Sequence, residues 1–320
     1  MKKYYFTLFI VLFMGIIFGL FGYFNHGFQP VVGDTILGSV HVLRHEDSKQ
    51  MHTYQTKQPF KALTIFVDQT DILIKQGSQY SVNFETNQKA TVKVSDQQLE
   101  IKQKARYNFQ MFYFPVIKKS TLTITIPNLT TIDKLNLSIE NCRVRFDHLN
   151  LKKAYLNTSN SQLTFNQTKI LDKFHTNDQE GNYKLANSEF HNIKFNSDST
   201  NIDTNHSKMI NLGIDLEDEL KFNSEYSELT NLNLEANGNT TNYKMHNSKL
   251  LGNNKINGDE TYLDLIHINQ DLNLKFTRDE NTSILYNNSN YKGDSLVNKS
   301  TTNSLKTISN SGQIKIIKLK

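Results

Sequence analysis

The densest group of residues that could do chemistry is a run of four acids, Asp215, Glu217, Asp218 and Glu219. Polysaccharide-cleaving β-helices need clustered acids with a calcium ion and a base, or a carboxylate pair roughly 5–9 Å apart. A loop with four acids in five residues is more often simply solvated. The chain has no tryptophan for stacking on sugars, and it lacks P-loop, HExxH, GxSxG and calcium-nonapeptide motifs. We therefore expect no enzymatic activity and no cofactor.

Three histidines could contribute to a metal site. His41, His45 and His52 lie near Glu46 and Asp47, and histidines at i and i+4 would share one face of a helix. No fourth His or Cys ligand has a clear place nearby, so we expect solvated polar side chains and no bound metal.

The single cysteine, Cys142, excludes an internal disulfide framework and a four-cysteine metal site. The sequence offers this thiol no base partner, and it lies in a turn before a strand. We expect it to be structural rather than nucleophilic.

An aromatic cluster lies in the segment RYNFQMFYFPVIKK, beside Arg106, Lys118 and Lys119. If exposed, this segment would dock on a membrane surface or on a partner. If buried, it would pack as a strand, because RYNFQMFYF can also alternate with period two. The candidate docking residues are Tyr107, Phe109, Phe112, Tyr113 and Phe114.

From about Leu135 to Tyr291 the chain repeats a short alternating strand after a turn rich in Asn, Ser, Gly or Asp. The repeat steps by 19, 20, 18, 19, 20, 22 and 21 residues. A near-fixed step marks stacked repeats, and period-two alternation indicates strands rather than helical hairpins. The sequence predicts an all-β fold, a single-stranded β-solenoid of β-helix type with coils of about 20 residues. The aligned positions are Val144, Leu163, Tyr183, Asn201, Leu220, Thr240, Tyr262 and Ser283.

Each coil should bury alternating apolar side chains in a central column, and Asn at equivalent turns could stack in hydrogen-bonded ladders. The predicted inward pairs are Leu135 and Leu137, Leu163 and Phe165, Ile193 and Phe195, Leu212 and Ile214, Leu232 and Leu234, Leu263 and Leu265, and Leu272 and Leu274. The predicted ladder turns are Asn187-Ser188, Asn223-Ser224, Asn247-Ser248 and Asn288-Ser289.

Both ends of the stack need protection. Six period-two segments lie between Phe60 and Asn128, namely ALTIFVD, DILIKQ, YSVNFET, ATVKVSD, QLEIKQK and STLTITIP. We expect these segments to pair as a small sheet covering the first coil, because an uncapped coil offers an open edge for aggregation. At the other end, GQIKIIKLK predicts a final strand that closes the stack, with Lys315, Lys318 and Lys320 protecting its edge.

The order ALTIFVDQTDILIKQGSQYSVNFET, ATVKVSDQQLEIKQK, TLTITIPN and KLNLSIENCRVRF resembles the bacterial adhesin-like β-solenoid family, also called the toast-rack domain. The resemblance covers about residues 60 to 310 and rests on strands and turns rather than on an active-site motif. The family often has Ser-Gly-Asp before each strand, whereas here a glycine remains only in Gly181-Asn182, Gly258-Asp259 and Gly293-Asp294. The resemblance implies an adhesin-like surface module or, by analogy, a neighbour of membrane-stress regulators.

The N-terminus predicts a membrane anchor. After Lys2 and Lys3, Tyr4 to Phe24 form 21 residues without a charge, which as a helix would span roughly 31 Å. The lysines favour a cytoplasmic N-terminus, so the rest of the chain would lie outside. A cleaved secretory signal is the competing interpretation, although its apolar core is usually shorter and the pattern around Gly22 suits cleavage poorly.

The predicted organisation has five parts at the cell membrane. Residues 1–3 form a cytoplasmic tail, 4–24 a transmembrane signal anchor and 25–59 a juxtamembrane spacer. Residues 60–128 form a β-rich cap with the first coils, and 129–320 form the β-solenoid.

Composition fits an extended domain with much solvated surface. Hydrophobic residues make up 37% of the chain, below the usual content of roughly 45–50% in globular proteins. The net charge of +5 is mild and spread along the chain. Nucleic-acid binding needs a concentrated basic face, so we expect no nucleic-acid partner.

Two functions follow from these expectations. The first is a non-enzymatic, adhesin-like interaction module, whose long face would bind a wall polymer or a host-surface ligand. The alternative is a regulatory or scaffolding module of the cell envelope that binds a membrane protein. A three-residue cytoplasmic tail argues against direct signalling, and the short stalk keeps the domain near the membrane.

Overall fold

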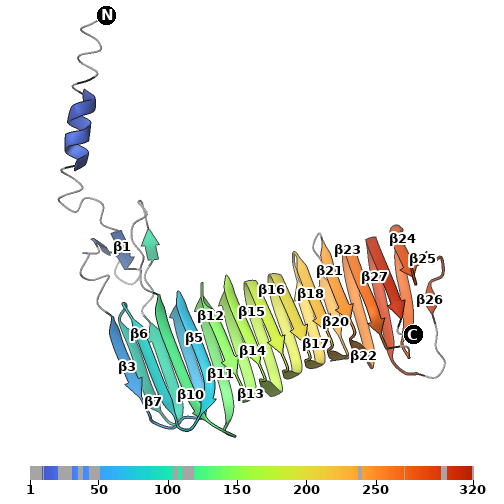
Figure 1. The fold of residues 1–320 in the computed structure, drawn as a ribbon, viewed down its shortest axis with the longest axis horizontal. Helices are drawn as coiled ribbons and strands as arrows, with labels where there is room; N and C mark the ends of the chain where they lie inside the picture. The colour runs from blue at the N-terminus through green and yellow to red at the C-terminus, as the bar shows by residue number, and fades with distance from the viewer. Residues whose placement is uncertain are drawn as a thin grey trace, which may run out of the picture. The chain divides into compact units, whose positions relative to one another are not determined.

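The computed structural model describes residues 9, 11–20, 31–34, 39–42, 51–103, 107–109, 119–236, 240–269, 271–296 and 301–318. The chain divides into two units, both drawn in Figure 1. The smaller unit comprises residues 1–52, 87–89 and 104–118, and the larger comprises 53–86, 90–103 and 119–320.

The smaller unit contains a helix over residues 11–20 and a three-stranded antiparallel sheet with β1 at its centre. Its strands are β1 (Val31–Asp34), β2 (Ser39–Val42) and β9 (Tyr107–Phe109). The helix falls within the predicted anchor. Among the described residues, no helix is both long and apolar enough to cross a bilayer. The transmembrane span therefore stays a prediction.

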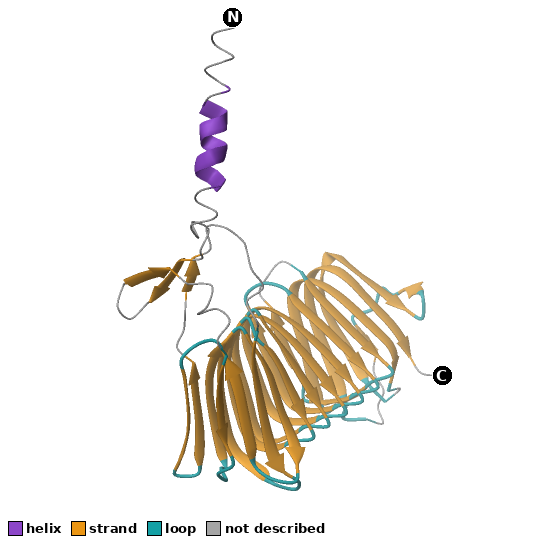
Figure 2. Cartoon of the chain, turned by 60° about the vertical axis from the view of Figure 1, so that its left-hand side comes forward, coloured by secondary structure: helices purple, strands orange, loops and turns teal. Residues whose placement is uncertain are grey.

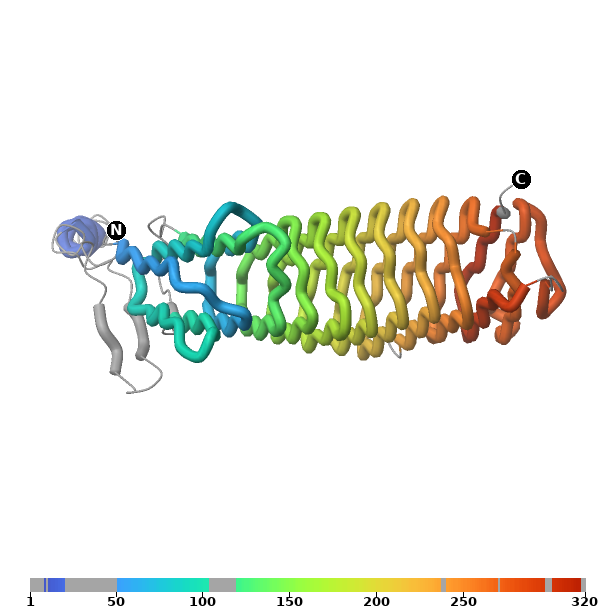
Figure 3. Tube along the Cα trace, turned by 90° about the horizontal axis from the view of Figure 1, so that it is seen from below, coloured from blue at the N-terminus to red at the C-terminus, as the bar shows by residue number. Residues whose placement is uncertain are grey.

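The larger unit is the predicted β-solenoid, with its strands in two layers that enclose the apolar core (Figure 2). Five long strands bend at a corner and contribute one half to each layer, and inner strands pair in parallel with the next coil. The bent strands are β15 (Lys169–Ala186), β16 (Glu189–Asn205), β23 (Asn253–Ile268), β24 (Asn273–Tyr286) and β27 (Ser304–Lys318). Figure 3 shows the coils stacked side by side in chain order through the middle of the unit.

We name the layers after β11 and β12. Besides the first halves of the bent strands, the β11 layer contains β4 (Ala62–Asp68), β7 (Ala90–Ser95), β8 (Gln98–Gln103), β11 (Thr131–Glu140), β13 (Asn150–Ser159), β17 (Lys208–Leu216), β19 (Glu228–Thr230), β20 (Asn233–Ala236), β22 (Lys249–Leu251) and β26 (Ser295–Leu296). Besides the second halves, the β12 layer contains β3 (His52–Thr56), β5 (Thr70–Gly77), β6 (Ser81–Thr86), β10 (Ser120–Pro127), β12 (Arg143–Asp147), β14 (Ser161–Asn166), β18 (Leu220–Glu225), β21 (Thr241–His246) and β25 (Ser289–Asn290).

The core confirms the predicted inward residues, all of which are buried. Aromatic rings extend the column from coil to coil. Phe146 stacks on Phe165 with ring centroids 4.5 Å apart, and Phe165 meets Phe190 edge to face at 5.0 Å. Burying one such side chain stabilises the fold by roughly 1.5–3 kcal/mol, so each coil depends on its neighbours for stability.

The predicted alignment of coils is right at first and then slips. Val144, Leu163 and Tyr183 lie opposite one another as expected. Beyond them the inward column continues through Ile202, Phe222, Tyr243 and Leu263, and then through Ile314 to Ile284. The predicted positions miss this column, Asn201, Tyr262 and Ser283 by one residue, Leu220 by two and Thr240 by three. Because side chains alternate, a shift of one residue exchanges the core face for the solvent face, as at Asn201, Tyr262 and Ser283. Leu220 is two residues off and is still buried.

At one corner the coils share a ladder of buried hydroxyl groups. The backbone N–H of Ser188 donates to Ser207 Oγ at 3.2 Å, that of Ser207 to Ser227 Oγ at 3.1 Å, and that of Ser227 to Ser248 Oγ at 3.2 Å. The residue before each serine has φ between 48° and 51°. The predicted turns at Ser188 and Ser248 belong to this ladder, but serine, not asparagine, makes the bonds.

An asparagine ladder does exist, at a different place from the predicted turns. It runs along the outside of the β11 layer, where Asn231 Nδ2 donates to Asn211 Oδ1 at 3.0 Å and Asn211 Nδ2 to Asn192 Oδ1 at 2.8 Å. All three residues have positive φ, a conformation that Asn tolerates better than most residues. Asn223, a predicted ladder residue, instead lies within β18 and donates to Asp203 Oδ1 at 2.8 Å.

Both ends of the stack differ from the prediction, because a strand is inserted out of chain order. β5 pairs with β10 on one side and β12 on the other, and β4 lies between β8 and β11. β4 and β5 thus form a coil of the stack itself, next to β8 and β10. Antiparallel β6 and β7 pair in turn with β10 and β8, beyond that coil. At the far end β27 lies between β23 and β24 (Figure 1). The prediction that β27 closes the stack is wrong, since period-two alternation identifies strands but not their spatial order.

Candidate interaction surface

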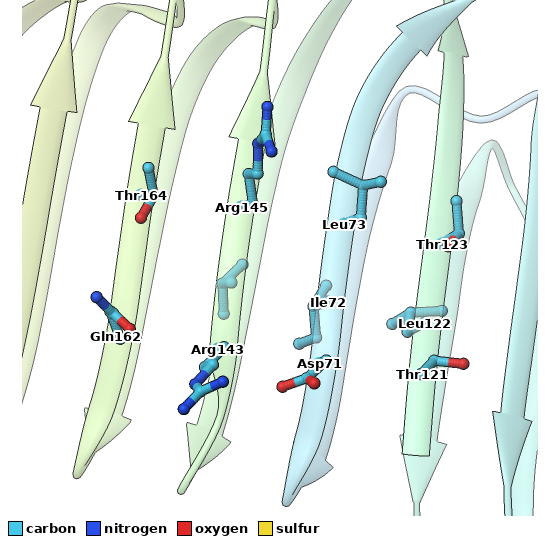
Figure 4. Close-up of a pocket in the computed structure, with 11 residues that line it drawn as sticks. Asp71, Ile72, Leu73, Thr121, Leu122, Thr123, Arg143, Arg145, Gln162 and Thr164 are labelled. Carbon is cyan, nitrogen blue, oxygen red and sulfur yellow. The ribbon is translucent and has the colours of Figure 1, made fainter. Parts of the chain in front are cut away.

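Two open grooves lie on the outer face of the β12 layer. The first, with a volume of about 400 Å³, crosses β10, β5, β12 and β14 (Figure 4). These strands lie in register, so each contributes outward side chains at alternate positions. Its polar lining comprises Asp71, Thr121, Thr123, Arg143, Arg145, Gln162 and Thr164.

The first groove offers one arginine without a carboxylate partner. Asp71 is engaged by Lys119 at 3.1 Å, and Arg145 Nε contacts Asp147 Oδ2 at 2.8 Å. Arg143 lies opposite Asp71 in the register but forms no ion pair within the part of the chain that the structure describes. A guanidinium carries five donors in a planar fork, so Arg143 can bind a carboxylate, phosphate or carbonyl group of a ligand.

The second groove lies further along the same face, over β15, β16, β18 and β21, with a volume of about 600 Å³. Charges of both signs line it, which suits a polar ligand with donors and acceptors better than a simple ion. Its charged and titratable residues are Lys184, Asp203, Glu225, Lys244 and His246.

Asp178, a carboxyl group whose pKa is strongly shifted, is buried in the core and not in either groove. Burial raises the pKa of Asp178 to about 6. Tyr183 donates its hydroxyl to Asp178 Oδ2 at 3.1 Å and lies 2.8 Å from Thr176 Oγ1. Neither groove includes Asp178. A substrate in either groove would not meet this carboxyl group, so we assign the cluster a structural role.

Cys142 lies at the corner between β11 and β12. Its thiol occupies the place that the hydroxyl of Ser161 has in the next coil. Cys142 Sγ accepts the N–H of Thr70 at 3.4 Å and contacts Glu140 O at 3.1 Å, while the Cys142 N–H donates to Ser161 Oγ at 3.2 Å. Burial raises the pKa of the thiol to about 12. Such a thiol is a poor nucleophile at neutral pH, which fits the predicted structural role.

The acidic run does not assemble a site. Asp215 lies in β17 opposite Asn196 and Glu235, and Glu219 pairs with Lys221 at 2.9 Å. Among the described residues, no group of three His, Cys, Asp or Glu side chains is placed to hold a metal ion.

The other predicted candidates fall in or near the smaller unit. Tyr107 and Phe109 belong to β9, which pairs with β1, whereas Phe112, Tyr113 and Phe114 lie outside the described residues. His41 belongs to β2 and His52 begins β3, while His45, Glu46 and Asp47 also lie outside. The docking segment and the histidine group therefore stay untested predictions.

The family described as Toastrack DUF4097 matches residues 60–317. The chain belongs to the Toastrack family. This match spans the larger unit from β4 into β27 and agrees with the resemblance inferred from the strands.

Two solved structures are similar to this Toastrack protein. One is a candidate adhesin from Bacteroides fragilis, 10% identical, covering 84% of this chain and 98% of its own, with a TM-score of 0.27. The other is a candidate cell adhesion protein from Clostridium sporogenes, 9% identical, covering 84% of this chain and 100% of its own, with a TM-score of 0.21. No curated protein matches the chain.

The sequence did not single out the grooves of the Toastrack domain. Arg143 and Arg145 appeared only as part of the strand CRVRF, whose alternation was informative about the core. The sequence did indicate that both arginines occupy outward positions of one strand. Only the register shows that Arg143 lies between Asp71 and Gln162.

Proposed function

We propose that this Toastrack protein is a non-enzymatic interaction module of the cell surface that binds its ligand along the outer face of the β12 layer. The observation that supports it is the pair of grooves on one face, each with polar or charged side chains from four neighbouring strands. A parallel ladder holds these side chains at strand spacings of about 4.8 Å, so little ordering is needed on binding.

A binding role is also supported by where the unusual titratable groups lie. Asp178 and Cys142 are buried and make hydrogen bonds that hold corners of the coil. Catalysis requires such groups to face a substrate cavity. The two grooves instead present ordinary polar and charged side chains.

We further propose that the N-terminal segment anchors the module in the cell membrane, with the bulk of the chain outside. Apolar side chains of the described helix are exposed, with Val11 66% and Phe18 67% accessible. A helix with such side chains gains by entering an apolar environment, and Lys2 and Lys3 favour a cytoplasmic start. Sequencing the N-terminus of membrane-extracted protein tests this, since a start near Asn25 would indicate cleavage.

The function is tested by photo-crosslinking in intact cells. Probes replace Thr164 in the first groove and Asn223 in the second, and a control probe replaces Thr277, which is exposed on β24 in the β11 layer. We expect the groove probes, but not the control, to capture wall polymer or added host matrix. Capture of one membrane protein in fixed amount would instead favour the envelope scaffold. Capture by the Thr277 probe equal to that by the groove probes, or no capture by the groove probes, would refute the proposed surface.

A further inference from the structure

A row of lysines runs along the axis of the solenoid on the other layer. Lys134 in β11 lies opposite Lys153 in β13, which lies opposite Lys173 in β15. Neighbouring strands are about 4.8 Å apart, so three ammonium groups project side by side from successive coils. In the next column, Tyr155, His175 and Lys194 are likewise in register. These six residues form what we call the lysine strip.

The strip departs from the charge pattern of its own layer. Another column of the same layer runs from β15 through β16, β17 and β19 to β22. Its register reads Lys169, Glu189, Lys208, Glu228 and Lys249, with the sign alternating at every coil. Two of these contacts are ion pairs, at 3.6 Å and 3.3 Å. Alternating charges stabilise neighbouring strands, whereas like charges directly opposite are destabilising. The lysine row therefore costs stability that the alternating column avoids.

Few carboxylates lie close enough to neutralise the positive charge of the lysine strip. Lys153 pairs with Asp172 at 3.4 Å, and nearby Asp133 is engaged by Lys152 at 2.6 Å. Lys134, Lys173 and Lys194 form no ion pair with any described residue. The pKa of His175 reflects this environment. Burial lowers it, and the positive charges of Lys173 and Lys194 lower it further.

Tyr155 holds the strip together and limits what it can bind. Lys134 Nζ lies 5.3 Å and Lys173 Nζ 5.6 Å from the centroid of its ring. These cation–π contacts position two of the free ammonium groups. They also occupy the ring, so it is not free to stack on a nucleobase or a sugar, as a protein that binds single-stranded nucleic acid would require.

We propose that the lysine strip binds a linear phosphodiester polymer without aromatic bases, a poly(alditol phosphate) of the cell wall, aligned with the solenoid axis. The strip reaches from β11 to β16, three strand spacings or about 14 Å, which is longer than one phosphate group. It is open rather than enclosed, which suits a chain that passes over it. The strip lies on the β11 layer and does not depend on the grooves proposed above.

The test measures binding of fluorescently labelled poly(glycerol phosphate) to the full chain by anisotropy. One variant combines Lys134→Gln, Lys173→Gln and Lys194→Gln. A matched control, Lys57→Gln with Lys75→Gln and Lys93→Gln, removes the same charge from exposed lysines elsewhere. We expect the strip variant to bind about tenfold more weakly or worse, and the control to stay within about twofold of wild type. A plot of the logarithm of the binding constant against the logarithm of the salt concentration has a negative slope. Each lysine removed should make this slope less steep by about 0.7.

A variant with Arg at the same three positions keeps the charge and should bind as wild type does, which separates loss of charge from loss of folding. Equal weakening by the strip and control variants, or no binding by wild type, would overturn the proposal. Tighter binding of phosphatidylglycerol vesicles or of a single-stranded oligonucleotide would overturn the assignment of the polymer. So would competition by inorganic phosphate that equals the polymer's at the same phosphate concentration.

Discussion

The serine ladder allows one hydroxyl group to be removed without disturbing the packing. Ser207 Oγ accepts the N–H of Ser188 at 3.2 Å, and its hydroxyl lies 3.0 Å from Asn205 O and 3.2 Å from Leu185 O, to which it can donate. Ser207→Ala keeps the Cβ and removes one oxygen, so the core loses almost no volume. What it leaves is the N–H of Ser188 without its acceptor, at a residue that is only 3% exposed.

The expected magnitude follows from that orphaned donor. Leaving a buried N–H unsatisfied costs about 1–3 kcal/mol, whereas the Asn205 carbonyl still accepts the N–H of Asn187 at 3.0 Å and adds little. We therefore expect a loss of about 2 kcal/mol for Ser207→Ala. Ser207→Cys should fall between, because a sulfur already accepts such an N–H where Thr70 donates to Cys142 Sγ.

The measurement is urea unfolding of the full chain, with amide hydrogen exchange to localise the effect. Ser138→Ala is the control, since Ser138 makes no side-chain hydrogen bond to the described residues and should change stability by less than about 0.5 kcal/mol. Exchange should accelerate first at the Ser188 amide and its neighbouring coils. If Ser207→Ala matches the control in both assays, the ladder does not stabilise the corner and the argument fails.

Three further predictions concern Asp178, Gly312 and Cys142. Burial raises the pKa of Asp178 to about 6 from 3.8, so the folded state holds its proton more tightly. The contribution of Asp178 to stability should be complete below about pH 4 and should fall by up to about 3 kcal/mol as the pH rises through about 6. The difference in urea midpoint between wild type and Asp178→Asn should follow this dependence on pH. Gly312 has φ of 113° and faces the backbone of Thr261, so Gly312→Ala should undock β27 and raise hydrogen exchange there while β13 stays protected. Cys142 should resist iodoacetamide at about pH 8 until urea unfolds the chain, and rapid labelling of folded protein would contradict its buried thiol.

The sequence was most informative where side-chain alternation and burial coincide. Segments such as ALTIFVD and STLTITIP are β4 and β10 to the residue, and every predicted inward residue is buried. A β-strand has only two faces, so a few apolar residues at alternate positions determine which one is inward. Nothing beyond the local sequence is needed for that inference.

Register and partners were less predictable, because they depend on the neighbouring coil. The predicted alignment placed Asn201 opposite Tyr183, where the structure has Ile202. Turns of similar composition permit coils of slightly different length, so composition alone does not define the alignment. The serine ladder is invisible as a motif, since each bond joins a backbone N–H to a hydroxyl in the next coil. The same holds for Arg143 and the lysine strip, whose significance lies in what stands opposite them.

The inserted strands at the two ends also bear on the order of folding. Inner coils meet partners about 20 residues away, whereas β5 reaches β10 and β23 reaches β27 across about 50 residues. Closing the longer loop costs somewhat more entropy, roughly 0.6 kcal/mol per doubling of length. More importantly, β24 has no parallel partner among the described strands until β27 docks. A strand added at the outer edge would protect one neighbour, but β27 pairs with β23 and β24 at once. Loss of this one strand would open two parallel edges, which makes its docking the step that separates a closed stack from one prone to edge-to-edge association.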